Sequence, residues 1–210
     1  MLFLVGEKVR STARPLGEHR CAVCKAPQPF GLHEESMWFS LFTIPLLPLE
    51  KIAAYWRCEN CLSAYQPNQL DEPSCVPLVR RVSLYLLLGY NQHDHIGVAD
   101  DICQRVTGFG IEAEQSRELV REIAAGRLDM VAQVEALAHQ LNIKGKQQVL
   151  EAAFLATYVC CDLQYEDRLR INLMGNALGV GLEFVEFAIS QVRKQGYYGI
   201  RRLGQAESEA

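Results

Sequence analysis

Two pairs of cysteines, each with the spacing Cys-x-x-Cys, constrain this 210-residue chain more than any other feature. The first pair is Cys21 and Cys24, and the second is Cys58 and Cys61. At this spacing the two sulfur atoms of a pair lie on one tight turn and can bind the same tetrahedral ion. The sequence therefore predicts a structural zinc site with these four cysteines as its ligands. Four thiolates leave the zinc no open position for a substrate, so we assign no catalysis to it.

Two other interpretations of the cysteine pairs are redox activity and simple burial as thiols. A redox-active CxxC usually occurs singly beside a βαβ unit, and the sequence shows no such unit. The apolar start Met1–Val5 reaches Glu7 and Lys8 at once, which is not the order of a signal peptide. The apolar stretches are also far shorter than the roughly 20 residues that span a bilayer. We therefore expect a cytoplasmic protein without a membrane span, whose cysteines are ligands or core residues rather than disulfides.

The 33 residues between the two pairs are expected to fold back on themselves. Residues 36–44 are aromatic and β-branched, which favours a strand. Pro45 and Pro48 are expected to break that strand, and residues 52–56 resume the pattern before the second pair. The insert is thus predicted to form a strand, a turn and a strand.

Three further segments carry a family resemblance: Phe3–Gly6, Trp38–Leu49 and Tyr55–Cys61. With the first cysteine pair, their order and spacing resemble a bacterial family of zinc-ribbon domains. The resemblance covers residues 1–68 and implies a small β zinc ribbon at the N-terminus. The chain departs from that family where a glycine often follows each pair, because these positions hold Lys25 and Leu62.

From Pro77 onward, apolar residues recur at spacings of three and four, which predicts helices. One helix face consists of Leu128, Val131, Val134, Leu137, Ala138 and Leu141. The other predicted helices cover residues 77–92, 98–108, 113–125, 145–161, 166–178 and 182–195. Prolines and turn residues interrupt the pattern just before the helices. We therefore expect a zinc-ribbon domain at 1–68, a linker at 69–77, an all-helical domain at 78–196 and a tail at 197–210.

The helical part also contains a candidate internal repeat. Residues 86–94 align with residues 154–162, and each segment leads from an apolar helix to an aspartate. With this arrangement, residues 78–195 resemble the TerB-like family, named from tellurite-resistance proteins. The resemblance implies an all-α TerB-like bundle of about seven helices. In that family, each half commonly has an aspartate followed seven residues later by a glutamate, and the two together can bind a divalent cation.

Four carboxylates lie at or near the corresponding positions: Asp94, Asp101, Asp162 and Glu166. Asp101 follows Asp94 by seven residues, but Leu169 takes the equivalent place after Asp162, so the second half has lost part of the pattern. Oxygen ligands of this kind suit Ca²⁺ or Mg²⁺, which makes these residues candidates for a second metal site. The competing interpretation, which we favour, is that acids in the first turn of a helix serve capping and the helix dipole alone.

The segment His93–His95 allows two interpretations of its own. Its two histidines are able to act as metal ligands or as part of an acid–base pair. Histidines just after a helix more often bond the last helical carbonyl groups, and we favour that role. For Cys75, Cys103 and Cys160 we expect packing in the core.

Composition and motifs narrow the class of function. The net charge of −4, and the scarcity of lysine and arginine among the aromatic residues of the first domain, argue against nucleic-acid binding. Phosphate loops, nucleophile elbows and HExxH motifs do not occur in the sequence. We therefore expect a non-catalytic zinc-binding adaptor that binds protein partners. The TerB-like resemblance implies a bacterial response to tellurite or metal stress, with partners in complexes near the membrane.

Two alternatives stay open. Many zinc ribbons bind nucleic acids, and the aromatic residues of the first domain are able to stack on bases. A metal-dependent enzyme or divalent-cation sensor would instead use the carboxylates around Asp94, Asp101 and Asp162, provided that they converge.

Overall fold

The computed structural model describes residues 5–41, 44–92, 94–161 and 163–196. The chain divides into two compact units. The first contains Met1–Ser74 together with His139–Asn142, and the second contains Cys75–Ala138 and Ile143–Ala210. The division after Ser74 falls inside the predicted linker.

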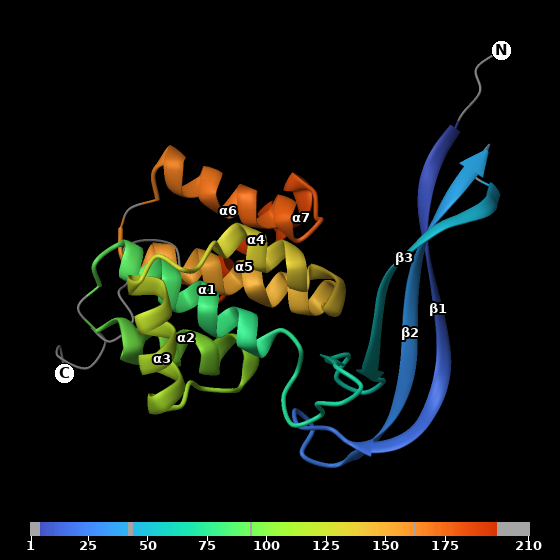
Figure 1. Cartoon of the computed structure of the whole chain (residues 1–210), viewed down its shortest axis with the longest axis horizontal. Coiled ribbons are helices and arrows are strands. Elements are labelled where there is room, and N and C mark those ends of the chain that lie inside the picture. Colours follow the sequence, from blue (N-terminus) through green and yellow to red (C-terminus); the bar gives the residue numbers. More distant parts are fainter. Residues whose placement is uncertain (1–4, 42–43, 93, 162, 197–210) are drawn as a thin grey trace. The chain divides into compact units, whose positions relative to one another are not determined.

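The first unit is a four-stranded antiparallel sheet with the strand order β1-β2-β3-β4. Three of the strands are long: β1 is Val5–Arg20, β2 is Pro27–Leu41 and β3 is Ile44–Cys58. The fourth, β4, is only Ala64–Tyr65 and pairs with the end of β3. A strand of 15 residues spans about 50 Å. Figure 1 shows β1, β2 and β3 running beside one another as one extended, twisted ribbon.

This sheet contradicts the prediction of a small β zinc ribbon. Of the two short strands predicted at 36–44 and 52–56, residues 36–41 belong to β2 and residues 52–56 to β3. Both strands begin well before these segments, β2 at Pro27 and β3 at Ile44, and residues 42–43 lie outside the described ranges. Pro45 and Pro48 do not break the structure, because both lie within β3, opposite Ser40 and Trp38 of β2. The pairing shifts register beside these positions. Since β4 pairs only with Trp56 and Arg57, the proline-containing part of β3 has one partner strand, and an edge strand tolerates a missing N–H group.

The core of the first unit is small. Cys21, Phe30, Cys58 and Tyr65 form one buried cluster, and Ala53, Tyr55 and Ala64 form another. Partly buried residues that pack on the first cluster are Leu16, Ala22, Cys24, Trp56, Cys61 and Leu70. The larger of the two buried clusters therefore surrounds the four cysteines, and most of the sheet has little apolar burial to stabilise it.

The second unit contains seven α-helices in the part of the chain that is described. Their bounds are α1 Val76–Gly89, α2 His95–Thr107, α3 Ala113–Ala124, α4 Met130–Leu137, α5 Ile143–Tyr158, α6 Tyr165–Ala177 and α7 Leu182–Lys194. Helix α1 packs against α2, α3, α4 and α5, while α5 also packs against α2, α6 and α7. These two helices supply much of the core, which agrees with the apolar patterns predicted for them. The layout of an N-terminal β part and a C-terminal helical part is as expected.

The helix predicted over residues 128–141 is shorter than expected. It begins at Met130, because the Asp129 carboxylate accepts a hydrogen bond from the Ala132 N–H group and caps the helix there. It ends at Leu137 and passes into a 3₁₀ turn, Ala138–Gln140. Two residues after this turn comes Asn142, which belongs to the first unit. Its side chain donates a 2.7 Å hydrogen bond to the Leu62 carbonyl group of the same unit.

Within the described ranges, no single helix is long and apolar enough to cross a membrane. Helices α6 and α7 together satisfy that test by length and composition, but they bend by 118° where they meet.

Candidate metal centre

The four predicted cysteine ligands converge at one point. One ligand atom from each lies within 4.8 Å of the others. Across the cluster, the Sγ atoms of Cys21 and Cys61 are 3.6 Å apart, and those of Cys24 and Cys58 are 3.9 Å apart. A tetrahedral ion with metal–sulfur distances of about 2.3 Å holds its sulfur ligands about 3.8 Å apart. The cluster therefore has the dimensions of a site that binds a metal such as zinc.

The two cysteine turns have the same backbone geometry. The Lys25 N–H group donates to the Cys21 carbonyl at 2.9 Å, and the Leu62 N–H group donates to the Cys58 carbonyl at 2.9 Å. Both Lys25, with φ 58°, and Leu62, with φ 62°, adopt the left-handed conformation that glycine favours. Neither position holds the glycine that often follows such a pair, and the turns keep their conformation without it. Each of these residues accepts a backbone strain of about 1–2 kcal/mol.

Tyr65 is the main uncharged neighbour of the cluster. It is fully buried on β4, and its Oη lies 3.1 Å from Cys21 Sγ. The same oxygen accepts a 3.4 Å hydrogen bond from the Val23 N–H group, so it is oriented to donate its own hydrogen to the sulfur. On the other side, the Asn60 side chain donates to Cys24 Sγ at 3.4 Å. Hydrogen bonds of this type orient thiolate ligands and spread their charge.

The thiol groups titrate differently because their surroundings differ. Burial raises the pKa of Cys21, but hydrogen bonds from Tyr65 and from the Cys24 N–H group outweigh it and bring the pKa down to about 7. Burial dominates at Cys58 and raises the pKa of its thiol to about 12. Thiolates are the form that binds metals, so a divalent cation at the centre of the cluster would displace the remaining protons.

A group of three hydrogen-bonded, charged or ionisable side chains lies beside the second cysteine turn. The Glu59 carboxylate lies 2.9 Å from His33 Nε2 and accepts a 2.8 Å hydrogen bond from Arg57. The Arg57 guanidinium, together with His33, holds the pKa of Glu59 below its usual range. A Cβ atom at Gly31 would lie 2.8 Å from Glu59 Oε1, so a larger residue there would displace the Glu59 carboxylate. The group links the turn to strands β2 and β3.

Sequence reasoning missed Tyr65, His33 and Glu59. Tyr65 follows the second pair by four residues and gives no motif of its own. His33 lies in an apparently solvent-facing stretch, yet only 4% of it is exposed. Only Glu59 could have been predicted from its position. It lies inside the second CxxC turn, so its side chain must be close to the metal ligands.

The candidate second site shows no convergence among the described residues. Asp94 caps α2, where its Oδ1 accepts a 3.0 Å hydrogen bond from the Gly97 N–H group. Asp101 is exposed on α2, and Glu166 is exposed in the first turn of α6. Asp162 lies outside the described residues. Within the described ranges, the four cysteines are the one group of three or more potential ligands that come together.

The remaining candidates have local structural roles. In the segment His93–His95, His93 is outside the described residues, and His95 Nδ1 lies 3.2 Å from the Gln92 carbonyl oxygen. Cys75 and Cys103 are buried, as the prediction of core packing requires, whereas Cys160 is only partly buried. Burial raises the pKa of Cys103 to about 12.

Comparison with known proteins gave no match to a family model, to a curated protein or to a solved structure. The resemblance of residues 78–195 to the TerB-like family thus stays a prediction, and the metal centre rests on its own geometry.

Proposed function

We propose that this chain is a non-catalytic interaction protein whose first unit is held folded by a structural zinc ion. The observation that carries the proposal is the convergence of the Cys21, Cys24, Cys58 and Cys61 sulfur atoms within 4.8 Å. Zinc favours tetrahedral thiolate sites, and four protein ligands complete its coordination. Such an ion stabilises the fold and leaves no position at which a substrate is activated.

The small core of the first unit supports a structural role for the ion. Outside the cluster that contains Cys21 and Cys58, its described buried apolar residues are Ala53, Tyr55, Ala64 and Leu141. A core of this size stabilises a unit of about 70 residues poorly, and domains of that kind commonly rely on a metal or on disulfides. The ion would join the β1–β2 turn to the end of β3.

An exposed apolar stretch of β3 supports the interaction role. Ile44, Leu46, Leu47 and Leu49 have exposed fractions between 49% and 62%. Several exposed apolar side chains on one short segment are typical of surfaces that bind other proteins. Pro45 and Pro48 lie in the same stretch and withhold backbone N–H groups, which discourages strand addition along this edge. A protein partner would therefore contact the side chains of this β3 stretch. We place the interaction in a bacterial response to tellurite or metal stress on the TerB-like resemblance alone.

Metal content tests the first part of the proposal. Purified protein is expected to contain one zinc ion per chain, measured by mass spectrometry of the metal. Cys58→Ser should lose the zinc, because three thiolates bind it far more weakly. Cys103→Ser is the matched control, since Cys103 is a buried cysteine of the second unit, and it should keep the zinc. Zinc retained in full by Cys58→Ser would refute the assignment.

Crosslinking in the native cell tests the interaction role. The double substitution Leu46→Glu and Leu47→Glu should abolish crosslinks between the chain and a protein partner while zinc content is unchanged. Leu182→Glu changes an equally exposed leucine on α7 and should leave the crosslinks intact. Crosslinks that persist in the double variant would exclude the β3 stretch as the docking surface.

A further inference from the structure

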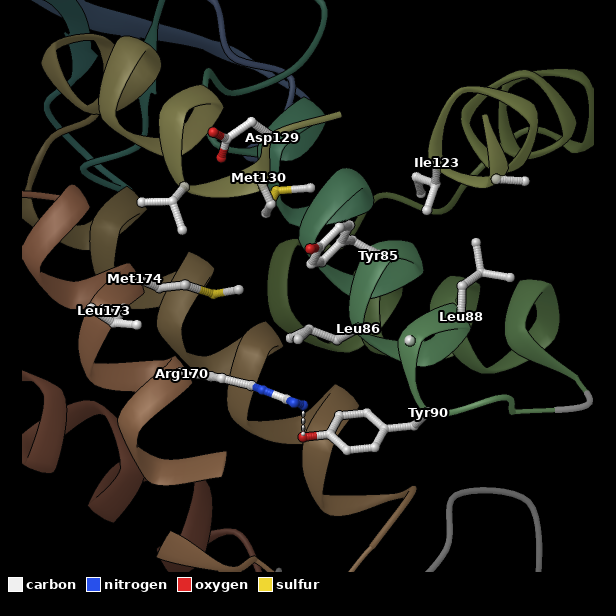
Figure 2. A pocket seen from close by; sticks show the side chains of 13 residues that line it. Tyr85, Leu86, Leu88, Tyr90, Ile123, Asp129, Met130, Arg170, Leu173 and Met174 are labelled. Carbon is white, nitrogen blue, oxygen red and sulfur yellow. Dashed lines mark hydrogen bonds between the residues drawn. The ribbon is translucent and has the colours of Figure 1, made fainter. Parts of the chain in front are cut away.

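The second unit contains a pocket that the proposed function does not use. Helices α1, α3 and α6, with the start of α4 and Asp129 just before it, line an open pocket of about 590 Å³. That volume lies within the range of pockets that hold small molecules, about 300–1,000 Å³. The lining residues lie on or beside four helices, of which α1 and α6 are far apart in the sequence, and Figure 2 shows their side chains facing a common space.

The wall of the pocket is mostly apolar and adaptable. It is lined by Leu86, Leu88, Ile123, Met130, Leu173 and Met174. Methionine side chains are flexible and polarisable, so they fit apolar ligands of varied outline. A hydrocarbon chain would lose its contact with water against this wall, which favours binding.

One end of the pocket carries a positive charge that is held in place. Arg170 Nη1 donates a 3.1 Å hydrogen bond to Tyr90 Oη, and its guanidinium lies 5.6 Å from the centre of the Tyr90 ring. Tyr90 Oη in turn donates to Asp167, which is buried and also accepts a 2.9 Å hydrogen bond from the Gln164 N–H group. Asp167 thus accepts from Tyr90 and Gln164, and both Asp167 and Glu166 interact electrostatically with the charge of Arg170. The guanidinium is exposed and has five N–H donors, so the donors that do not bond Tyr90 are able to bind the carboxylate of a ligand in a bidentate manner.

The opposite end of the pocket carries a negative charge. Asp129 lines it while one of its oxygens accepts the capping hydrogen bond from the Ala132 N–H group. In Figure 2, Asp129 and Arg170 lie on opposite sides of the pocket, with Met130 and Met174 between them. An anionic group is therefore attracted at the Arg170 end and repelled at the Asp129 end.

We infer that this pocket binds a small amphipathic monocarboxylate, with its carboxylate on Arg170 and its hydrocarbon chain along the wall between α1, α4 and α6. The charge distribution sets the selectivity. A neutral alcohol of the same length forgoes the ion pair, and a dicarboxylate places its second charge near Asp129. An amine has only the Asp129 end to pair with, where one carboxylate oxygen already accepts the hydrogen bond from the Ala132 N–H group. The monocarboxylate is the ligand of this series that pairs with Arg170 and brings no charge to the Asp129 end.

Calorimetric titration of the intact, zinc-loaded chain with decanoate tests the inference. Decanoate should bind with a 1:1 ratio and about 5-fold more tightly than decanol, decanedioate or decylamine, because it alone pairs with Arg170 without bringing a charge to the Asp129 end, and the exposed guanidinium is partly screened by water. Absence of decanoate binding, or equal affinity for decylamine, would overturn it. Binding can fail here without any effect on the zinc or crosslinking results, so the two proposals stand separately.

Substitutions locate the site. Arg170→Gln should weaken decanoate binding about 5-fold and leave decanol binding unchanged. Arg168→Gln, two residues away on the same helix but outside this pocket, is the matched control and should bind decanoate normally. Leu173→Trp should fill the cavity and abolish the binding of both ligands, while its thermal melting confirms that it folds. Equal effects of Arg170→Gln and Arg168→Gln, or undiminished binding in Leu173→Trp, would place the ligand elsewhere and refute the assignment.

Discussion

At the scale of single residues, Tyr65 shapes the metal centre more than any other residue that is not a ligand. Its hydroxyl group connects Cys21 Sγ with the Val23 N–H group, and its ring packs against Phe30 with centroids 5.5 Å apart. A single side chain thus joins the ligand cluster to the small core around it.

We expect Tyr65→Phe to weaken zinc binding about 10-fold, because loss of an outer hydrogen bond to a ligand typically costs 10–100-fold in metal affinity. Competition with a chromogenic chelator measures the change. Tyr55→Phe is the matched control, since Tyr55 is also buried in the first unit but its hydroxyl bonds Glu35 at 2.7 Å instead of a cysteine. A similar loss of affinity in both variants would show that the effect is general destabilisation.

The second residue-scale prediction concerns Glu151, on α5. Burial raises the pKa of its carboxyl group, and a hydrogen bond from Gln147 only partly opposes this. The folded chain therefore holds this proton more tightly than the unfolded chain. Stability is lost as the pH rises from the unfolded pKa through the raised folded pKa.

Glu151→Gln removes that titration, so its melting temperature should exceed that of the natural chain at pH 7. The two melting temperatures should converge at pH 4, where the natural carboxyl group is largely protonated in the folded chain. Thermal melting followed by circular dichroism provides the measurement. The exposed Glu135→Gln on α4 should change little at either pH, and a gain that is independent of pH in Glu151→Gln would contradict the explanation.

At the scale of elements, the ends of the helices show where local sequence signals operate. Helix α2 begins at the Asp94 cap and ends where Gly108, with φ 79°, adopts the left-handed conformation and donates to the Gln104 carbonyl at 2.8 Å. Glycine adopts this conformation without the strain that a Cβ atom creates.

Gly108→Ala should destabilise the second unit by about 1 kcal/mol, because alanine is strained in the left-handed region. Gly89→Ala is the paired substitution. Gly89 ends α1 without a positive φ and with open space around it, so alanine there should stabilise by about 0.5 kcal/mol. Chemical denaturation of both variants measures the change in the free energy of unfolding and shows whether each substitution stabilises or destabilises. Stabilisation by Gly108→Ala would contradict the assigned role of the turn.

The strands show the limit of local signals. Pro45 and Pro48 were expected to end a strand, which is the usual effect of proline on a central strand. They lie instead on the part of β3 that pairs with β2 alone, where a missing N–H group costs little. Whether a strand is central or at an edge depends on its neighbours, and the residues around a proline do not encode it.

At the scale of the whole molecule, the two units have different sources of stability. The second unit has an extensive apolar core built on α1 and α5, whereas the first has small clusters and the four cysteines. Both tryptophans of the chain, Trp38 and Trp56, belong to the sheet of the first unit, so their fluorescence reports on that unit. The helical circular dichroism signal reports on the second.

Removal of zinc with a strong chelator should therefore change tryptophan fluorescence to that of solvent-exposed indole while most of the helical signal remains. Restoring zinc should reverse the change. Magnesium or calcium is the control, because hard cations do not suit a thiolate site and should not restore the fluorescence. Simultaneous loss of both signals would show that the two units do not unfold independently.

The sequence by itself determined the features that depend only on residues close together in the chain. The CxxC spacing identified the four cysteines that converge, because the geometry of each pair is complete within a turn of a few residues. The apolar periodicity likewise indicated helical segments in the C-terminal part, because each α-helix forms its hydrogen bonds within itself.

Only the tertiary structure decided what depends on partners that are distant in sequence. The length of β2 and β3, the approach of Tyr65 to Cys21 and the pocket around Arg170 all require segments that the chain order separates. The compact zinc-ribbon prediction was wrong for this reason. Cysteine spacing specifies the ends of the loop between the pairs, while cross-strand pairing decides how far the strands of that loop extend.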